Sequence, residues 1–171
     1  MLHDLAWLNS LPAAEAEKEL LQCCGSTRWA RQMIAARPYA TLEALLASAN
    51  DIWWSLDRND WLEAFRSHPK IGEKKAADPV STQARQWSGQ EQAGVATASQ
   101  DTVDSLAQLN RAYEEKFGFI FIICATGKTS GEMLSALRER IEHDPADELP
   151  IAAAEQSKIT ALRLNKLLTS G

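Results

Sequence analysis

The sequence is poor in cysteine and has no excess of basic residues, and each shortage excludes a class of protein. The three cysteines, Cys23, Cys24 and Cys124, are odd in number and two are adjacent, so they do not suggest a disulfide framework. A reducing compartment fits this pattern best. The net charge is −5 at pH 7. Because nucleic-acid binding draws mainly on the neutralisation of phosphates, this charge argues against a nucleic-acid partner.

Long hydrophobic runs and targeting segments are also missing. The longest apolar run is far too short to cross a bilayer. The N-terminus carries Asp4 and lacks the basic region of a secretory signal, and the C-terminal LLTSG is not a peroxisomal signal. We therefore expect a soluble cytoplasmic protein with no membrane contact. A chain of this length suits one domain, because it buries on the order of two-thirds of its unfolded surface, and we expect a single domain over residues 1–171.

Strand-like segments are scarce, whereas helical periodicity runs through most of the chain. We predict an all-α domain of about eight helices without a true sheet. The predicted helices cover, approximately, residues 13–23, 27–36, 42–56, 59–68, 88–99, 101–117, 129–141 and 146–168. Residues 70–87, with Gly72, Pro79 and many charges, are typical of a surface loop, which could include one helical turn.

Polar residues at four positions indicate where helices begin. Thr41 and Asn59 are typical N-cap residues. Ser88-x-x-Glu91 and Thr129-x-x-Glu132 both have the spacing of a capping box, in which each side chain bonds the other residue's backbone N–H. We therefore predict that helices start at these residues.

One segment, GFIFIICA over residues 118–125, interrupts the helical pattern. It is rich in β-branched and aromatic residues, as a buried strand would be. No second segment could pair with it, so an extended conformation would leave its backbone groups in need of other partners. A small heterocycle rich in amides could be one such partner. Periodicity alone leaves a buried helical turn equally open.

Histidine is rare, and His68 has the most unusual setting of the three. It stands at the end of a predicted helix directly before Pro69, which biases it away from helical geometry and stiffens the chain. A stiffly held imidazole suits proton transfer. A histidine that simply complements the helix dipole is the ordinary alternative. The sequence has no clustered metal ligands, so we predict no metal site. Lys70, Lys74 and Lys75 either attract an anion or form a solvated loop.

Two further charged residues have both an ordinary and a functional interpretation. Glu91 could be half of a capping box, or it could orient a histidine or bind ligand N–H groups. Arg163 lies at the edge of a helix face defined by Ile159 and Leu162, where it could form an ion pair or bind a substrate carboxylate or ureido group. Leu164 falls on the opposite side of that helix, and two apolar faces suggest a subunit interface or deep burial.

Six segments, in this order, resemble one known family. They are LAWLNSLP, CCGSTRWARQMIAARPY, DWLEAFRSHPKIGEKKA, WSGQEQAG, KFGFIFIICATGK and KITALRLNKLL. Together they are similar to the 2-oxo-4-hydroxy-4-carboxy-5-ureidoimidazoline (OHCU) decarboxylases, which complete the conversion of urate to allantoin. The resemblance covers nearly the whole chain.

The resemblance implies an all-helical homodimer that acts on a small ureidoimidazoline without metal or organic cofactor. It implies His68, Glu91 and Arg163 as catalytic residues. The implied substrate-binding residues are Pro69 beside the histidine, Arg163, and three residues of SGQEQ, namely Ser88, Glu91 and Gln92. The resemblance also implies substrate contacts by backbone atoms of Phe121, Ile122, Ile123, Cys124 and Ala125. Ile120 and His143 depart from the residues we expect in many members, proline and asparagine.

The chemistry of such a substrate agrees with so few catalytic residues. The departing carboxylate sits on a carbon next to a ring C=N, so the electrons released with CO₂ can delocalise into the heterocycle. The protein then has to orient the substrate and deliver a proton to one face, which gives (S)-allantoin. Two rivals stay open: a non-enzymatic helical interaction protein, and a related cofactor-free lyase that acts on another ureido compound.

Overall fold

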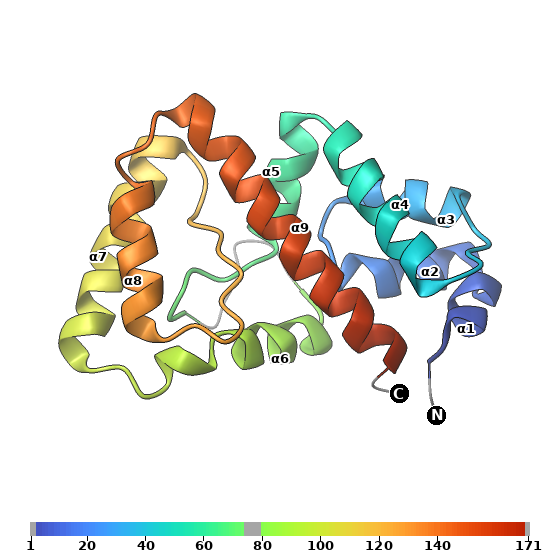
Figure 1. The fold of residues 1–171 in the computed structure, drawn as a ribbon, viewed down its shortest axis with the longest axis horizontal. Helices are drawn as coiled ribbons and strands as arrows, with labels where there is room; N and C mark the ends of the chain where they lie inside the picture. The colour runs from blue at the N-terminus through green and yellow to red at the C-terminus, as the bar shows by residue number, and fades with distance from the viewer. Residues whose placement is uncertain (1–2, 74–79, 170–171) are drawn as a thin grey trace. The chain divides into compact units, whose positions relative to one another are not determined.

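The computed structural model describes residues 3–73 and 80–169, and it confirms the all-α prediction (Figure 1). Over these residues the chain forms nine α-helices and one short 3-10 helix, and no strand. The helices are α1 (Leu5–Ser10), α2 (Ala13–Leu21), α3 (Thr27–Ala35), α4 (Leu42–Ser55), α5 (Arg58–Arg66), α6 (Thr82–Glu91), η1 (Ala93–Val95), α7 (Gln100–Phe117), α8 (Ser130–Arg140) and α9 (Pro145–Thr169). No helix in these ranges is both long enough and apolar enough to span a bilayer.

The helices fall into two units, and each has its own buried side chains. The first unit comprises Met1–Ala64 and Ser157–Gly171, and the second comprises Phe65–Gln156. In the first, the largest fully buried side chains include Trp29, Trp53 and Leu45; in the second they include Tyr113, Phe121, Leu106, Met133 and Leu137. The single-domain organisation stays a prediction.

Most helix starts follow local rules that the sequence makes visible. The side chain of Thr41 accepts a hydrogen bond from the Ala44 N–H, as its predicted N-cap role requires. The prediction for Asn59 was wrong, because α5 already begins at Arg58 and the Asp57 carboxylate accepts from the Asp60 N–H at 3.1 Å. Helix α1 was not predicted. It is a short helix capped by the Asp4 side chain.

The start of α6 was also predicted wrongly. Ser81 is the N-cap, and its hydroxyl accepts from the Ala84 N–H, so the helix begins within the predicted loop. Ser88 and Glu91 therefore lie in the last turn of α6 and do not open a helix. The second predicted capping box is confirmed: Thr129 and Glu132 bond each other's backbone N–H groups at the start of α8.

Residues 119–125 are extended and are neither helix nor paired strand. Helix α7 ends at Gly118, whose left-handed φ of 81° suits a residue without a Cβ. The following side chains are largely buried, from Phe119 at 6% exposed to Phe121 at 2%. The extended alternative is thus correct and the buried helical turn is wrong.

Helix α9 has one broad buried face, and the prediction of two separate apolar faces was wrong. Ile159, Arg163 and Leu164 are all buried, at 5%, 3% and 0% exposed. Leu162, which the sequence pattern placed with Ile159, is 37% exposed. At 100° per residue the buried positions span about half of the helix surface, and Leu162 points to the other half.

Candidate active site

His68 is held at the exit of α5, as the sequence predicts, and its ring has a defined partner. The His68 N–H bonds the Phe65 carbonyl at 3.1 Å, and Pro69 follows at once. His68 is buried, at 8% exposed, and its Nε2 lies 2.6 Å from Oε1 of Gln156 on α9. Gln156 is fully buried. The sequence analysis missed Gln156, because its neighbours Glu155, Ser157 and Lys158 are polar as well and nothing local distinguishes it.

The chain after His68 borders a pocket of about 370 Å³ in the second unit. Its lining residues are Pro69, Glu73, Thr82, Arg85, Gln86, Ser88, Gly89 and Gln92. Three predicted substrate contacts, Pro69, Ser88 and Gln92, therefore share one hollow. The Gln92 side chain also accepts the Gly72 N–H at 3.0 Å, which holds the loop after Pro69 against the end of α6.

The same loop has a second anchor on α7 and an ion pair. Asn110 donates to the Ile71 carbonyl at 3.2 Å. Lys70 lies 2.8 Å from the Glu114 carboxylate, so this lysine belongs to a partly exposed ion pair. Lys74 and Lys75 lie outside the described residues.

Two charged side chains supply partners for the backbone of residues 119–125. Arg140 of α8 donates to the Ile122 carbonyl, and its guanidinium lies 4.6 Å from the centre of the Phe121 ring. The Cys124 N–H donates to the Glu155 carboxylate of α9 at 3.1 Å. The predicted need of this segment for partners outside a sheet is thus met in part by protein side chains.

Arg140 belongs to a buried polar network that reaches three helices. It is 2.6 Å from Glu148, which is fully buried on α9 and also bonds Tyr113 of α7. His143 contacts the second oxygen of Glu148 at 2.9 Å. Burial, with the adjacent carboxylate, holds the pKa of the Tyr113 hydroxyl well above its usual range. The tyrosine is therefore a hydrogen-bond donor in this network.

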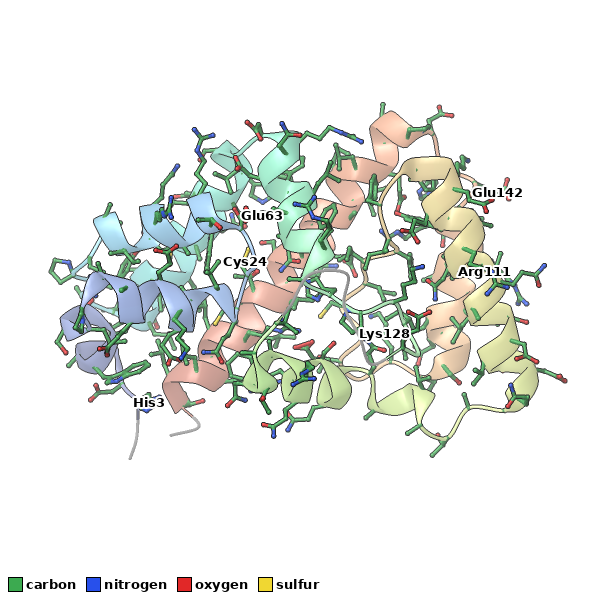
Figure 2. The ribbon with its side chains drawn as sticks, turned by 180° about the vertical axis from the view of Figure 1, so that it is seen from behind. His3, Cys24, Glu63, Arg111, Lys128 and Glu142 are labelled. Carbon is green, nitrogen blue, oxygen red and sulfur yellow. The ribbon has the colours of Figure 1, made fainter. Side chains whose placement is uncertain are left out.

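Glu91, in the last turn of α6, affects the Cys124 thiol of the same segment electrostatically. Burial raises the pKa of the Cys124 thiol, and the negative charges of Glu155 and Glu91 raise it further. The neighbouring chain is packed closely: a Cβ at Gly94 would lie 2.3 Å from the carbonyl oxygen of Lys128 (labelled in Figure 2). The 3-10 helix η1 and the backbone at Lys128 therefore fit together only with a glycine at position 94.

Aromatic packing connects Phe119, at the start of the segment, with Phe65 near the end of α5. The rings of Phe65 and Phe119 are 5.5 Å apart, and Tyr113 contacts both Phe119 and Phe121 edge to face. Phe65 of α5 therefore packs against the chain that follows α7, while a shared site for His68, Glu91 and residues 119–125 stays a prediction.

Arg163 belongs to the first unit, where it is buried at 3% exposed. It donates to the Gln22 carbonyl at 3.2 Å. Burial raises the pKa of Cys24 (labelled in Figure 2) to about 12, and the positive charge of Arg163 opposes that rise. All three cysteines are free thiols, in agreement with the sequence analysis. A common site for Arg163, His68 and Glu91 stays a prediction.

Comparison with known proteins gives consistent results. The family model described as OHCU decarboxylase matches residues 9–165. The chain is 46% identical over 154 residues to the Arabidopsis thaliana uric acid degradation bifunctional protein TTL, covering 90% of this chain and 47% of that protein. It thus spans less than half of the length of this bifunctional relative. It is 30% identical over 170 residues to the 2-oxo-4-hydroxy-4-carboxy-5-ureidoimidazoline decarboxylase of Amia calva, covering 96% of this chain and 94% of that protein.

A solved structure agrees with these sequence matches. The crystal structure of OHCU decarboxylase in the presence of (S)-allantoin aligns with a TM-score of 0.76 and 43% identity, over 88% of this chain and 97% of that one. The family model reaches across both units. With the near full-length match to the Amia calva enzyme, it shows that this chain belongs to the OHCU decarboxylase family.

Proposed function

We propose that this protein decarboxylates 2-oxo-4-hydroxy-4-carboxy-5-ureidoimidazoline to (S)-allantoin and CO₂, without a cofactor. The observation that carries the proposal is the setting of His68, a buried imidazole at a stiff turn whose next residue lines a 370 Å³ pocket, in a chain of this family. Pockets of this size suit a small heterocycle.

The substrate supplies the electron sink in this reaction. When the C–C bond to the carboxylate breaks, the electron pair passes into the adjacent ring C=N and CO₂ leaves. The ring nitrogen that receives the electron pair takes up a proton, which leaves an enol at the former carboxylate-bearing carbon. The 4-hydroxyl then loses its proton and becomes the carbonyl, while the neighbouring ring carbon that carries the ureido group gains a proton; protonation on one face gives the S enantiomer. The protein has to orient the substrate, remove water from the carboxylate and move protons, which a few side chains can do.

We assign the proton transfers to His68, with Glu91 as the residue that orients it or the substrate. His68 would handle the proton of the 4-hydroxyl group and assist the transfer that sets the new stereocentre. Arg163 would bind a polar substituent of the substrate through its planar guanidinium. Pro69, Ser88 and Gln92 would form the wall of the site, as their shared pocket supports.

The extended residues 119–125 would hold the ring of the substrate through backbone groups. Arg140 already bonds the Ile122 carbonyl, and Glu155 already accepts from the Cys124 N–H. The Ala125 carbonyl likewise accepts from the Lys128 N–H at 3.0 Å. We therefore assign the substrate hydrogen bonds to the backbone groups of Phe121 and Ile123 and to the N–H of Ala125. The side chains of Arg140 and Glu155 would hold those groups in place.

The test follows loss of the ureidoimidazoline by ultraviolet absorbance and formation of (S)-allantoin by circular dichroism. The substrate also decays spontaneously, so the chiral signal is the decisive one. We expect His68→Ala to lower kcat by about 10²- to 10⁴-fold, the usual contribution of general acid–base catalysis. His3→Ala, which removes a histidine near the N-terminus, serves as the matched control.

Three results would contradict this proposal. Full turnover by folded His68→Ala would remove His68 from the mechanism. Binding without turnover by the wild type would favour a non-enzymatic interaction protein, and turnover of a different ureido compound alone would favour a related lyase.

The assembly and the cellular location remain predictions with their own tests. We propose a homodimer, as the family resemblance implies, and sedimentation velocity at micromolar concentration would show it as a single species of twice the 18.9 kDa chain mass. The predicted cytoplasmic location would be tested by cell fractionation.

A further inference from the structure

One side of helix α6 forms much of the wall of the pocket of about 370 Å³. Four residues of this helix line the pocket, namely Thr82, Arg85, Gln86 and Gly89. Their spacing of three, four and seven positions from the first places them on the same side of the helix. The opposite side is buried through Ala84 and Trp87. The helix is therefore held by its packed side, while its other side borders a space of the size that small ligands occupy.

Two of the residues that line the pocket are charged, and they lie on different elements. Arg85 belongs to α6, and Glu73 belongs to the loop after Pro69. Both are exposed. Over residues 3–73 and 80–169, neither side chain forms a hydrogen bond or an ion pair. The pocket wall therefore holds a positive and a negative group that are not paired with each other.

A glycine inside the helix keeps the pocket open beside Arg85. Gly89 lies in α6 four positions after Arg85, so the two residues are neighbours on adjacent turns of the same side. A Cβ at Gly89 would meet no atom of the described residues within 4 Å. Packing among these residues therefore does not require a glycine, although a glycine within a helix destabilises it relative to alanine. What the missing side chain provides is room in the pocket next to the guanidinium.

We propose that Arg85 is the specificity-determining residue of this pocket and binds the carboxylate of a ureido carboxylate ligand, while Glu73 accepts N–H groups of the ureido arm. The inference rests on the proposed function, in which that ligand is the substrate. The planar guanidinium matches the two oxygens of a carboxylate, and a carboxylate side chain accepts hydrogen bonds from N–H groups. Because the protein has a net charge of −5, a local cation favours capture of an anionic substrate.

Arg85 should act on binding and not on bond cleavage. As CO₂ forms, negative charge leaves the carboxylate and moves into the ring. A guanidinium on the carboxylate therefore stabilises the bound substrate at least as much as the transition state, which lowers KM without raising kcat. The product has lost the carboxylate, so Arg85 distinguishes substrate from product.

The first experiment measures binding with a stable pair of ligands. Allantoate is an open-chain ureido carboxylate, and (S)-allantoin carries the ureido group without a carboxylate. By isothermal titration calorimetry, we expect Arg85→Gln to raise the dissociation constant of allantoate about tenfold, as for the loss of a charged hydrogen bond, and to leave that of (S)-allantoin unchanged. Arg111→Gln removes the same charge from an exposed position of α7 (labelled in Figure 2) and is the matched control.

Three binding results would overturn the inference. They are no binding of allantoate by the wild type, equal binding of allantoate by the wild type and Arg85→Gln, and an equal loss in Arg111→Gln. The last result would assign the effect to the overall charge of the protein. An equal loss for both ligands in Arg85→Gln would likewise contradict a role specific to the carboxylate.

The second experiment uses turnover of the ureidoimidazoline and a variant that fills the pocket. Arg85→Gln should raise KM about tenfold with kcat within about twofold of the wild type, and Arg85→Lys, which keeps the charge, should lie between them. Gly89→Leu places a side chain in the space beside Arg85 without weakening the helix, so it should raise KM and weaken the binding of both ligands. Gln90→Leu, one position further on and outside the pocket lining, is its control.

The outcomes separate this inference from the proposed function. If the wild type does not decarboxylate the ureidoimidazoline, the proposed function fails, while binding of allantoate that depends on Arg85 still supports the carboxylate site. If the wild type is active and Arg85→Gln changes neither KM nor allantoate binding, the proposed function stands and this inference fails. A lower kcat with unchanged KM in Arg85→Gln would overturn its assignment as a binding residue, and normal binding by Gly89→Leu would show that the ligand does not occupy this pocket.

Discussion

Helix α6 and the extended residues 119–125 both carry proposed substrate contacts, but they are held in place by different means. The backbone of α6 is bonded within the helix, from the Ser81 cap to its last turn. The extended segment depends on Arg140 and Glu155, which lie 18 and 31 positions from the backbone groups they bond. Stability in the helix is therefore spread over many local bonds, whereas in the segment it is concentrated in a few distant charged side chains.

Removing Arg140 should have the largest effect on the stability of the extended segment. Arg140→Met would leave the fully buried carboxylate of Glu148 without its cation and the Ile122 carbonyl without its donor. Removing one partner of a buried ion pair costs about 3–5 kcal/mol. We expect a loss of this size in the free energy of unfolding, measured by urea denaturation, together with weaker substrate binding.

Two variants on the same helix serve as controls for that measurement. Arg138→Met removes an exposed arginine of α8 and should change the free energy of unfolding by no more than about 0.5 kcal/mol. Arg140→Lys keeps the charge without the planar fork and should lie between the two. Equal stabilities for the Arg138 and Arg140 variants would show that the segment does not depend on this side chain.

For α6, the matching change is Ser81→Ala, and its effect should be smaller. Loss of an N-cap hydroxyl costs about 1 kcal/mol, because one backbone N–H of the first turn loses its acceptor. Ser88→Ala, in the last turn, removes no cap and should destabilise the helix less. Urea denaturation of both variants measures the difference. A larger loss for Ser88→Ala would restore Ser88 as the residue that starts the helix.

The same contrast explains which parts of the fold could be predicted from sequence. The caps at Thr41 and Thr129 depend on atoms three residues apart, so the local pattern is sufficient. Around α6 the capping-box spacing of Ser88 and Glu91 predicted the wrong start, and Ser81 was not identified as the cap. What favours Ser81 is the burial of Ala84 and Trp87, which only tertiary packing reveals.

The residues of the candidate site also differ in whether a local sequence pattern indicates them. His68 was singled out because it is rare and stands before Pro69, and Glu91 because it follows a serine at a known spacing; their catalytic roles stay predictions. Gln156, 88 positions from His68, carries no local mark of its contact with the histidine. The pattern at residues 118–125 showed that backbone partners were needed. It could not identify Arg140 and Glu155, since a fold brings those partners together across the sequence.

The smallest predicted effect concerns the capping box that α8 has and α6 lacks. Hydrogen bonds from Thr129 lower the pKa of the fully exposed Glu132 carboxyl from its ordinary value of 4.5. Because the folded pKa is the lower one, the carboxylate stabilises the folded state above pH 4.5, and this contribution is lost as pH falls through the lowered folded pKa. Glu132→Gln should therefore have a slightly flatter dependence of unfolding free energy on pH in that acidic range.

The control is Glu142→Gln, which changes an exposed residue beyond the end of α8, and both variants are measured by urea denaturation from pH 6 to about pH 3. Identical pH profiles for the two variants would show that the Thr129 bonds do not favour the charged form of Glu132.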